Sequence, residues 1–211
     1  ATIVPWTMYL AYGDKRILEE QYPSMAGWVS FIDSKAGERR LWNTGFHFGD
    51  WLAIFPEARP LVPAPKTTTA LIATAFFAYS TKLVEKAAHA LGKDDDARRY
   101  AQLFEEIRRA FCAEYVTPNG RIDADTQTAY VLALMFDLLP EEQRPLAVER
   151  LVRDIESRGY HLTTGFVGTP YLCDVLSRFG RSDVAYHLLN QKTFPSWLYP
   201  VRKGATTIWE R

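Results

Sequence analysis

The sequence alternates between segments with almost no charge and densely charged segments, and this alternation limits the folds open to it. Residues 126–139 carry one charge, on Asp137, whereas residues 140–158 carry nine. Residues 94–114 place ten charges around a single apolar stripe. A helix that is apolar on every side is buried, and a helix with one apolar stripe lies at the surface. The alternation therefore predicts buried helices that are each followed by a surface helix.

This pairing of a buried with a surface helix is predicted four times. The predicted pairs are 2–13 with 14–35, 66–81 with 94–114, 126–139 with 140–158, and a segment around 172–179 with one around 184–189. Turns inside the pairs are short and contain helix breakers, whereas the connections between pairs are long. We therefore predict an all-α fold, an α/α toroid whose inner ring is wrapped by an outer ring and whose long loops open at one rim. A helical solenoid with its long loops on one face is the alternative.

The composition suits a globular domain and argues against two classes of partner. The 211 residues are 47% hydrophobic, and 25 Lys+Arg balance 25 Asp+Glu. Neither nucleic acid nor a membrane is an expected partner, because nucleic acids and anionic membranes attract a local excess of Lys and Arg, and no uncharged run is long enough to span a bilayer. The N-terminal residues lack a basic signal-peptide region. The sequence leaves the location open and favours a soluble protein of the cytoplasm.

Cysteines, histidines and short motifs point to no cofactor. Cys112 and Cys173 lie in apolar helical patterns and are expected to be reduced core thiols. The four histidines show no metal-binding spacing, and the usual nucleotide-binding and nucleophile-elbow motifs do not occur in the sequence. We expect neither a metal nor an organic cofactor.

The connection 36–65 places aromatic rings beside polar groups, namely Trp42, His47, Asp50 and Trp51. A ring face covers the apolar face of a pyranose, and a carboxylate accepts paired hydrogen bonds from vicinal hydroxyls, so this mixture suits a sugar. The alternative is that Trp51 and Phe48 fill the core while Asp50 caps a short helix.

Two later connections carry weaker signals. Asp125 is expected to cap the helix that follows it. The hydroxyl- and glycine-rich loop 160–170 suits a polyol pocket or simply tight turns. The last stretch, 194–211, combines aromatics and prolines with one carboxylate, Glu210, which by itself is typical of a solvated chain end.

Several segments together resemble the catalytic domain of bacterial α-L-rhamnosidases. They read PWTMYLAYGDKRILEEQYPSM, FHFGDWLA, TQTAYVLAL, HLTTGFVGTPYL and PSWLYPVRKGATTIWER, and they follow that family's order over nearly the whole chain. The resemblance implies a six-hairpin α/α barrel and inverting hydrolysis of terminal α-L-rhamnosides. A rhamnosylated small molecule or polysaccharide is then the expected partner.

The resemblance also implies roles for individual residues. Glu210 matches the family's general base, and Asp50 and Trp51 match a segment expected to line the sugar subsite. Further candidates for substrate contact are Trp42, Trp209 and His47. Inversion requires a second carboxyl group, about 6.5–9.5 Å from the first, to act as general acid. The family's acid lies in an Asp-Glu-Arg-rich motif followed by Gly-Trp, and this sequence contains no such motif.

Four predicted hairpins are fewer than the six of a closed barrel. We therefore expect residues 1–211 to form a partial barrel within a longer enzyme, with hairpins missing at both ends. Without its acid the fragment should be nearly inactive, because general-acid catalysis contributes about 10²–10⁴-fold. Exposed inner helices of an open barrel should favour dimerisation. The competing readings are another α/α-toroid glycosidase and a non-catalytic sugar-binding or scaffold fragment.

Overall fold

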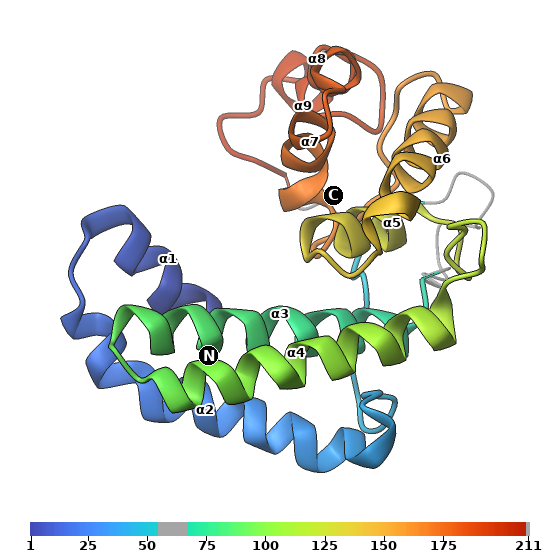
Figure 1. The fold of residues 1–211 in the computed structure, drawn as a ribbon. Helices are drawn as coiled ribbons and strands as arrows, with labels where there is room; N and C mark the ends of the chain where they lie inside the picture. The colour runs from blue at the N-terminus through green and yellow to red at the C-terminus, as the bar shows by residue number, and fades with distance from the viewer. Residues whose placement is uncertain (55–66, 210–211) are drawn as a thin grey trace. The chain divides into compact units, whose positions relative to one another are not determined.

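The computed structural model describes residues 1–54 and 67–209, and nine α-helices lie within these ranges (Figure 1). They are α1 (Ile3–Tyr12), α2 (Arg16–Ala36), α3 (Thr69–Ala90), α4 (Asp94–Tyr115), α5 (Gln127–Met135), α6 (Arg144–Ser157), α7 (Thr169–Arg178), α8 (Ser182–Leu189) and α9 (Leu198–Arg202). Two short 3₁₀ helices, η1 (Gly37–Arg39) and η2 (Glu141–Gln143), complete the order. In the described ranges the only extended pairing is an isolated bridge between Val116 and Ile122. The predicted all-α class is confirmed.

The chain divides into two compact units. The first comprises Ala1–Phe46 and Ala73–Glu114, and the second comprises His47–Ile72 and Tyr115–Arg211. Each unit contains two helical hairpins, so the eight longer helices form the four predicted pairs.

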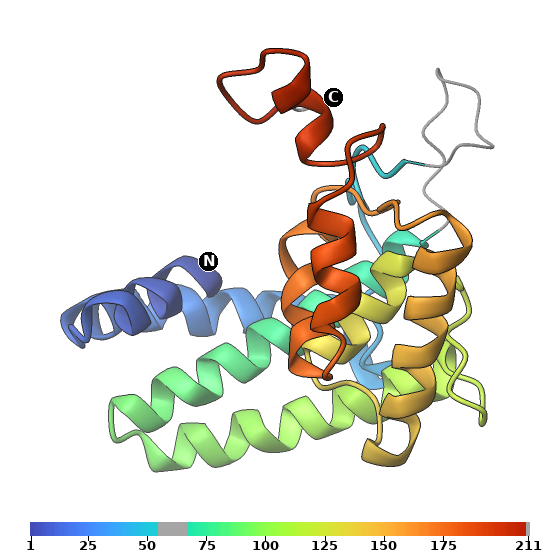
Figure 2. The same ribbon diagram turned by 90° about the horizontal axis from the view of Figure 1, so that it is seen from above.

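In the first unit, the two charge-rich helices contact each other, and so do the two charge-poor helices. The Tyr22 hydroxyl of α2 donates to the Asp96 carboxylate of α4 at 2.7 Å, which joins the two charge-rich helices. The Lys86 ammonium of α3 lies 5.9 Å from the ring centre of Trp6 in α1, which joins the two charge-poor helices. Figures 1 and 2 show α3 and α4 running side by side. The alternation of inner and outer helices predicted from charge is therefore present here.

The second unit repeats this arrangement. The rings of Phe136, directly after α5, and Tyr171 in α7 meet edge to face at 5.4 Å. On the outer side, Arg181, directly before α8, forms an ion pair of 3.8 Å with Glu156 of α6. All of α5 from Gln127 to Leu134 is buried, whereas α6 buries one stripe of Ala147, Val148, Leu151, Val152 and Ile155. These two helices match the prediction for an inner and an outer helix.

The first inner helix departs from the prediction. Residues 2–13 were expected to be buried on all sides, but within α1 only Pro5 is buried, and Val4, Leu10 and Tyr12 are exposed. An inner helix is buried all round only when it has inner neighbours on both flanks. Among the described residues, α1 contacts the inner helix α3 through Trp6, whose ring faces Lys86.

The start of α5 corrects a second prediction. The capping residue is Thr126, whose hydroxyl accepts a hydrogen bond from the Ala129 amide at 3.2 Å. Asp125 instead adopts a left-handed backbone conformation, with φ of 45°, and accepts a hydrogen bond from the Tyr130 hydroxyl. Burial, together with this bond to Asp125, raises the pKa of Tyr130. Asp and Thr are both common capping residues. The extended backbone that a capping residue requires is found at Thr126 and not at Asp125.

Cys112 and Cys173 do not form a disulfide, and neither belongs to the buried core that their apolar patterns predict. Each is half-buried, and burial raises the pKa of the Cys112 and Cys173 thiols. A raised thiol pKa lowers the fraction of reactive thiolate at neutral pH. No helix in the described part of the chain is long and apolar enough to cross a membrane.

Candidate functional site

A buried carboxylate joins two loops of the second unit. Asp50 is 2% exposed, and its Oδ2 accepts hydrogen bonds from the Thr128 hydroxyl at 2.5 Å and the Gly165 amide at 2.8 Å. Its Oδ1 accepts from the Val167 amide at 3.1 Å. The three donors come from the first turn of α5 and from the loop before α7. Asp50 therefore ties residues 47–54 to both.

Backbone contacts bring the same two loops together. The Phe166 amide donates to the Trp51 carbonyl at 2.9 Å, and the Ile54 amide donates to the Thr163 carbonyl at 3.0 Å. We call residues 50–54 and 163–167 the loop pair. A Cβ atom on Gly165 would lie 2.3 Å from the Trp51 carbonyl oxygen, so only glycine permits this approach.

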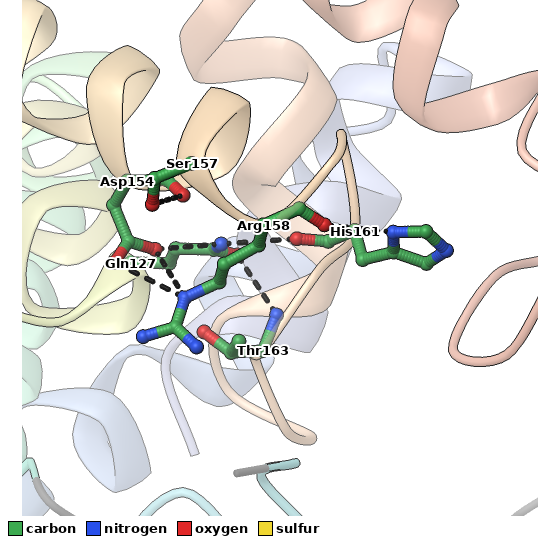
Figure 3. A network of polar contacts seen from close by, with 6 residues as sticks. All are labelled: Gln127, Asp154, Ser157, Arg158, His161 and Thr163. Atoms are coloured by element: carbon green, nitrogen blue, oxygen red, sulfur yellow. Dashed lines mark hydrogen bonds and ion pairs between the residues drawn. The ribbon is translucent and has the colours of Figure 1, made fainter. Parts of the chain in front are cut away.

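A second network holds the other end of the 160–168 loop (Figure 3). The buried Gln127 amide donates to Asp154 at 2.9 Å and to the His161 carbonyl at 3.1 Å, and its oxygen accepts from the Thr163 amide at 2.9 Å. Asp154 also pairs with Arg158 at 3.1 Å. The three hydrogen bonds of the Gln127 side chain therefore all go to the 160–168 loop and to α6.

The loop pair and the neighbouring Phe48 present aromatic rings to solvent. Trp51 is 46% exposed, Phe166 is 55% exposed, and Phe48 is 70% exposed. The rings of Phe48 and Trp51 meet edge to face with centres 6.0 Å apart. Exposed rings on a rigid backbone suit the apolar face of a sugar.

The alternative in which Trp51 and Phe48 fill the core is therefore wrong. The matching idea that Asp50 caps a short helix is also wrong, because two of its partners are amides of the 163–167 segment. Direct contact between Asp50 and a sugar stays a prediction. Thr128, Gly165 and Phe166 were missed by sequence reasoning, and only the glycine- and hydroxyl-rich composition of their segments hinted at them.

The remaining predicted site residues are spread over both units. His47 is half-buried in the second unit, and Trp209, at the end of the described residues, is 42% exposed. Trp42 belongs to the first unit, where its amide donates to the Thr74 hydroxyl at 3.0 Å and its ring meets Trp28 edge to face at 5.9 Å. Glu210, the predicted base, lies outside the described residues. Residues 1–54 and 67–209 contain no group of three His, Cys, Asp or Glu residues that could hold a metal ion.

Replacing Gln127 with Ala should loosen the 160–168 loop by about 1–3 kcal/mol, because the Thr163 amide and the His161 carbonyl lose their buried partner. Hydrogen exchange of the amides at 161–163 should speed up by about 5- to 150-fold. Gln102→Ala, at an exposed position of α4, is the matched control and should leave that exchange unchanged. Unchanged exchange in Gln127→Ala would contradict the anchoring role.

Comparison with known proteins gives one consistent family. The profile described as the bacterial alpha-L-rhamnosidase 6 hairpin glycosidase domain matches residues 1–211. An alpha-L-rhamnosidase of Alteromonas sp. (strain LOR) is 44% identical over 214 residues, which cover 100% of this chain and 23% of that protein. An alpha-L-rhamnosidase of Streptomyces avermitilis is 45% identical over 208 residues, which cover 99% of this chain and 19% of that protein.

Solved structures agree with these sequences. The crystal structure of the Streptomyces avermitilis alpha-L-rhamnosidase complexed with L-rhamnose has a TM-score of 0.90 at 44% identity, covering 100% of this chain and 19% of that one. The native alpha-L-rhamnosidase of Aspergillus terreus has a TM-score of 0.93 at 37% identity, covering 99% and 24%. The chain thus spans between 19% and 24% of the length of these relatives.

Proposed function

The chain belongs to the bacterial alpha-L-rhamnosidase six-hairpin glycosidase family, and from this premise we propose that it forms part of a longer enzyme that hydrolyses terminal α-L-rhamnosides with inversion. The observation that carries the proposal is 44% identity to an alpha-L-rhamnosidase over the whole chain. The exposed rings of the loop pair support it further, since they suit a sugar. The longer enzyme supplies the helical hairpins that precede and follow these four.

In this proposal, one of the two carboxyl groups of the inverting enzyme lies within residues 1–211 and the other lies outside them. Glu210 is the general base that takes a proton from the attacking water. The general acid, which protonates the leaving oxygen, lies outside residues 1–211. Water then attacks the anomeric carbon from the face opposite the leaving group. Because half of this machinery is supplied elsewhere, residues 1–211 alone should be nearly inactive.

The sugar contacts proposed from this chain are Trp51, Trp42, Trp209 and His47, and the buried Asp50 belongs to the same site. Trp51 is the best supported of these, because its ring is exposed while its backbone is held by the loop pair. The substrate is a rhamnosylated small molecule or polysaccharide, and the zero net charge argues against a nucleic-acid partner. Where residues 1–211 stand alone, the exposed apolar side chains of α1 favour dimerisation.

The proposal predicts that the longer enzyme releases 4-nitrophenol from 4-nitrophenyl α-L-rhamnopyranoside, whereas residues 1–211 alone release about 10²-fold less or none. Because the reaction inverts, proton NMR at early times should show β-L-rhamnose as the first product. The matched control substrate is 4-nitrophenyl α-D-glucopyranoside, which should not be hydrolysed. Hydrolysis of the glucoside alone would indicate another toroid glycosidase. Binding of L-rhamnose with no turnover would indicate a non-catalytic module.

A further inference from the structure

The carboxylate of Asp50 has little capacity left for a ligand. It is 2% exposed, and its two oxygens accept from Thr128, Gly165 and Val167. All three of these partners donate to the carboxylate, two of them through backbone amides. Because Asp50 is 2% exposed, a sugar hydroxyl would have to displace part of the surrounding loops to reach these oxygens.

The backbone that follows Asp50 is held in place at Trp51 and Leu52. The Trp51 carbonyl accepts from the Phe166 amide at 2.9 Å, and Leu52 adopts φ of 60°, which is unusual for a branched side chain. A conformation of this kind persists only where surrounding contacts impose it. The bonds from Asp50 to the facing segment are part of those contacts.

The two neighbouring side chains have opposite environments. Asp50 is buried between the loops, whereas Trp51 is 46% exposed and its ring meets that of Phe48 edge to face. The hydrogen bonds of Asp50 therefore hold the backbone segment that carries the Trp51 indole ring. We propose that Asp50 is a positioning residue, which fixes the Trp51 ring for the sugar instead of contacting the sugar itself. This inference rests on the proposed function.

The test uses the longer enzyme and two levels of disruption. Asp50→Asn replaces one acceptor oxygen with an NH₂ group that faces a donor. Thr128→Val is a milder, nearly isosteric change that removes only the hydroxyl donor, and Thr128→Ser restores that hydroxyl. KM and kcat are measured with 4-nitrophenyl α-L-rhamnopyranoside, and L-rhamnose affinity is measured by calorimetry. Asp183→Asn, an exposed position on α8, is the matched surface control and should leave KM and kcat unchanged.

We expect Asp50→Asn to raise KM by about tenfold or more, because small displacements of a positioning group are costly. Thr128→Val should raise KM less, and Thr128→Ser should stay close to the unsubstituted enzyme. The decisive comparison is made in a Trp51→Ala background. There Asp50→Asn should raise KM no further, because a positioning residue acts only through the group that it positions.

Each outcome decides between the readings. Full additivity of Asp50→Asn and Trp51→Ala overturns the positioning role and restores direct contact between Asp50 and the sugar. Unchanged KM in Asp50→Asn overturns both roles. Absence of turnover and of L-rhamnose binding in the unsubstituted enzyme overturns the proposed function, and this inference with it. Hydrogen exchange of residues 50–54 without ligand separates these cases from unfolding, which would expose amides throughout the second unit.

Discussion

Glu210→Gln in the longer enzyme is expected to lower kcat for 4-nitrophenyl α-L-rhamnopyranoside by about 10²–10⁴-fold or more. The change keeps the shape of the side chain and removes its ability to take a proton from water. Since a proton acceptor is needed only as water attacks, KM should change little and nearly the whole loss should appear in kcat. Initial rates and the pH dependence of kcat measure the effect.

A matched control for this substitution lies on the surface. Glu142→Gln, at an exposed position of η2, should leave kcat unchanged. Azide provides a second check, because it needs no deprotonation to attack carbon and should restore part of the lost rate in Glu210→Gln. A kcat within about threefold of the unsubstituted enzyme would remove Glu210 from the role of general base.

Gly165→Ala is expected to be the most damaging single change within the described residues of the site. A Cβ atom there would lie 2.3 Å from the Trp51 carbonyl oxygen, 2.6 Å from the Ala53 nitrogen and 2.8 Å from the Asp50 carbonyl oxygen. All three are backbone atoms, so no side-chain rotation relieves the overlap. We expect the loop pair to open at a cost of about 3 kcal/mol or more, and KM to rise by about 100-fold.

The measurement is hydrogen exchange of residues 50–54 and 163–167, together with KM for the rhamnoside. Gly27→Ala is the matched control, because a Cβ atom at Gly27, in α2, meets nothing within 4 Å. That change should stabilise α2 by about 0.5–1 kcal/mol, since alanine favours helix more than glycine does. Unaltered exchange of the loop pair in Gly165→Ala would show that the two backbones are not in close contact.

The helices could be predicted from the sequence because their signals are local. Charge density and apolar spacing are properties of neighbouring positions, and α4 begins at Asp94, the residue where its charged pattern starts. Burial is less local, which is why the apolar pattern of α1 taken alone predicts an enclosed helix. Its residues are apolar all round, but only a neighbouring helix can cover them.

The candidate site was predicted only in part for the same physical reason. The aromatic and polar composition near Asp50 indicated a sugar, and Trp51 is exposed as a sugar contact requires. The partners of Asp50, however, lie 78, 115 and 117 positions away in the chain, at Thr128, Gly165 and Val167. No spacing rule connects residues so far apart. Sequence patterns alone could not distinguish a buried carboxylate that links two loops from an exposed carboxylate that binds a sugar.

This separation along the chain has a consequence for the order of folding. The α5–α6 hairpin closes over the eight residues 136–143, whereas the bond from Gly165 to Asp50 closes a loop of 115. Closure entropy grows with the logarithm of loop length, which makes the longer closure costlier by about 2 kcal/mol. Contacts between near neighbours also form sooner than distant ones. We therefore expect the helical hairpins to assemble first and the aromatic surface of the loop pair to be among the last parts of this chain to form.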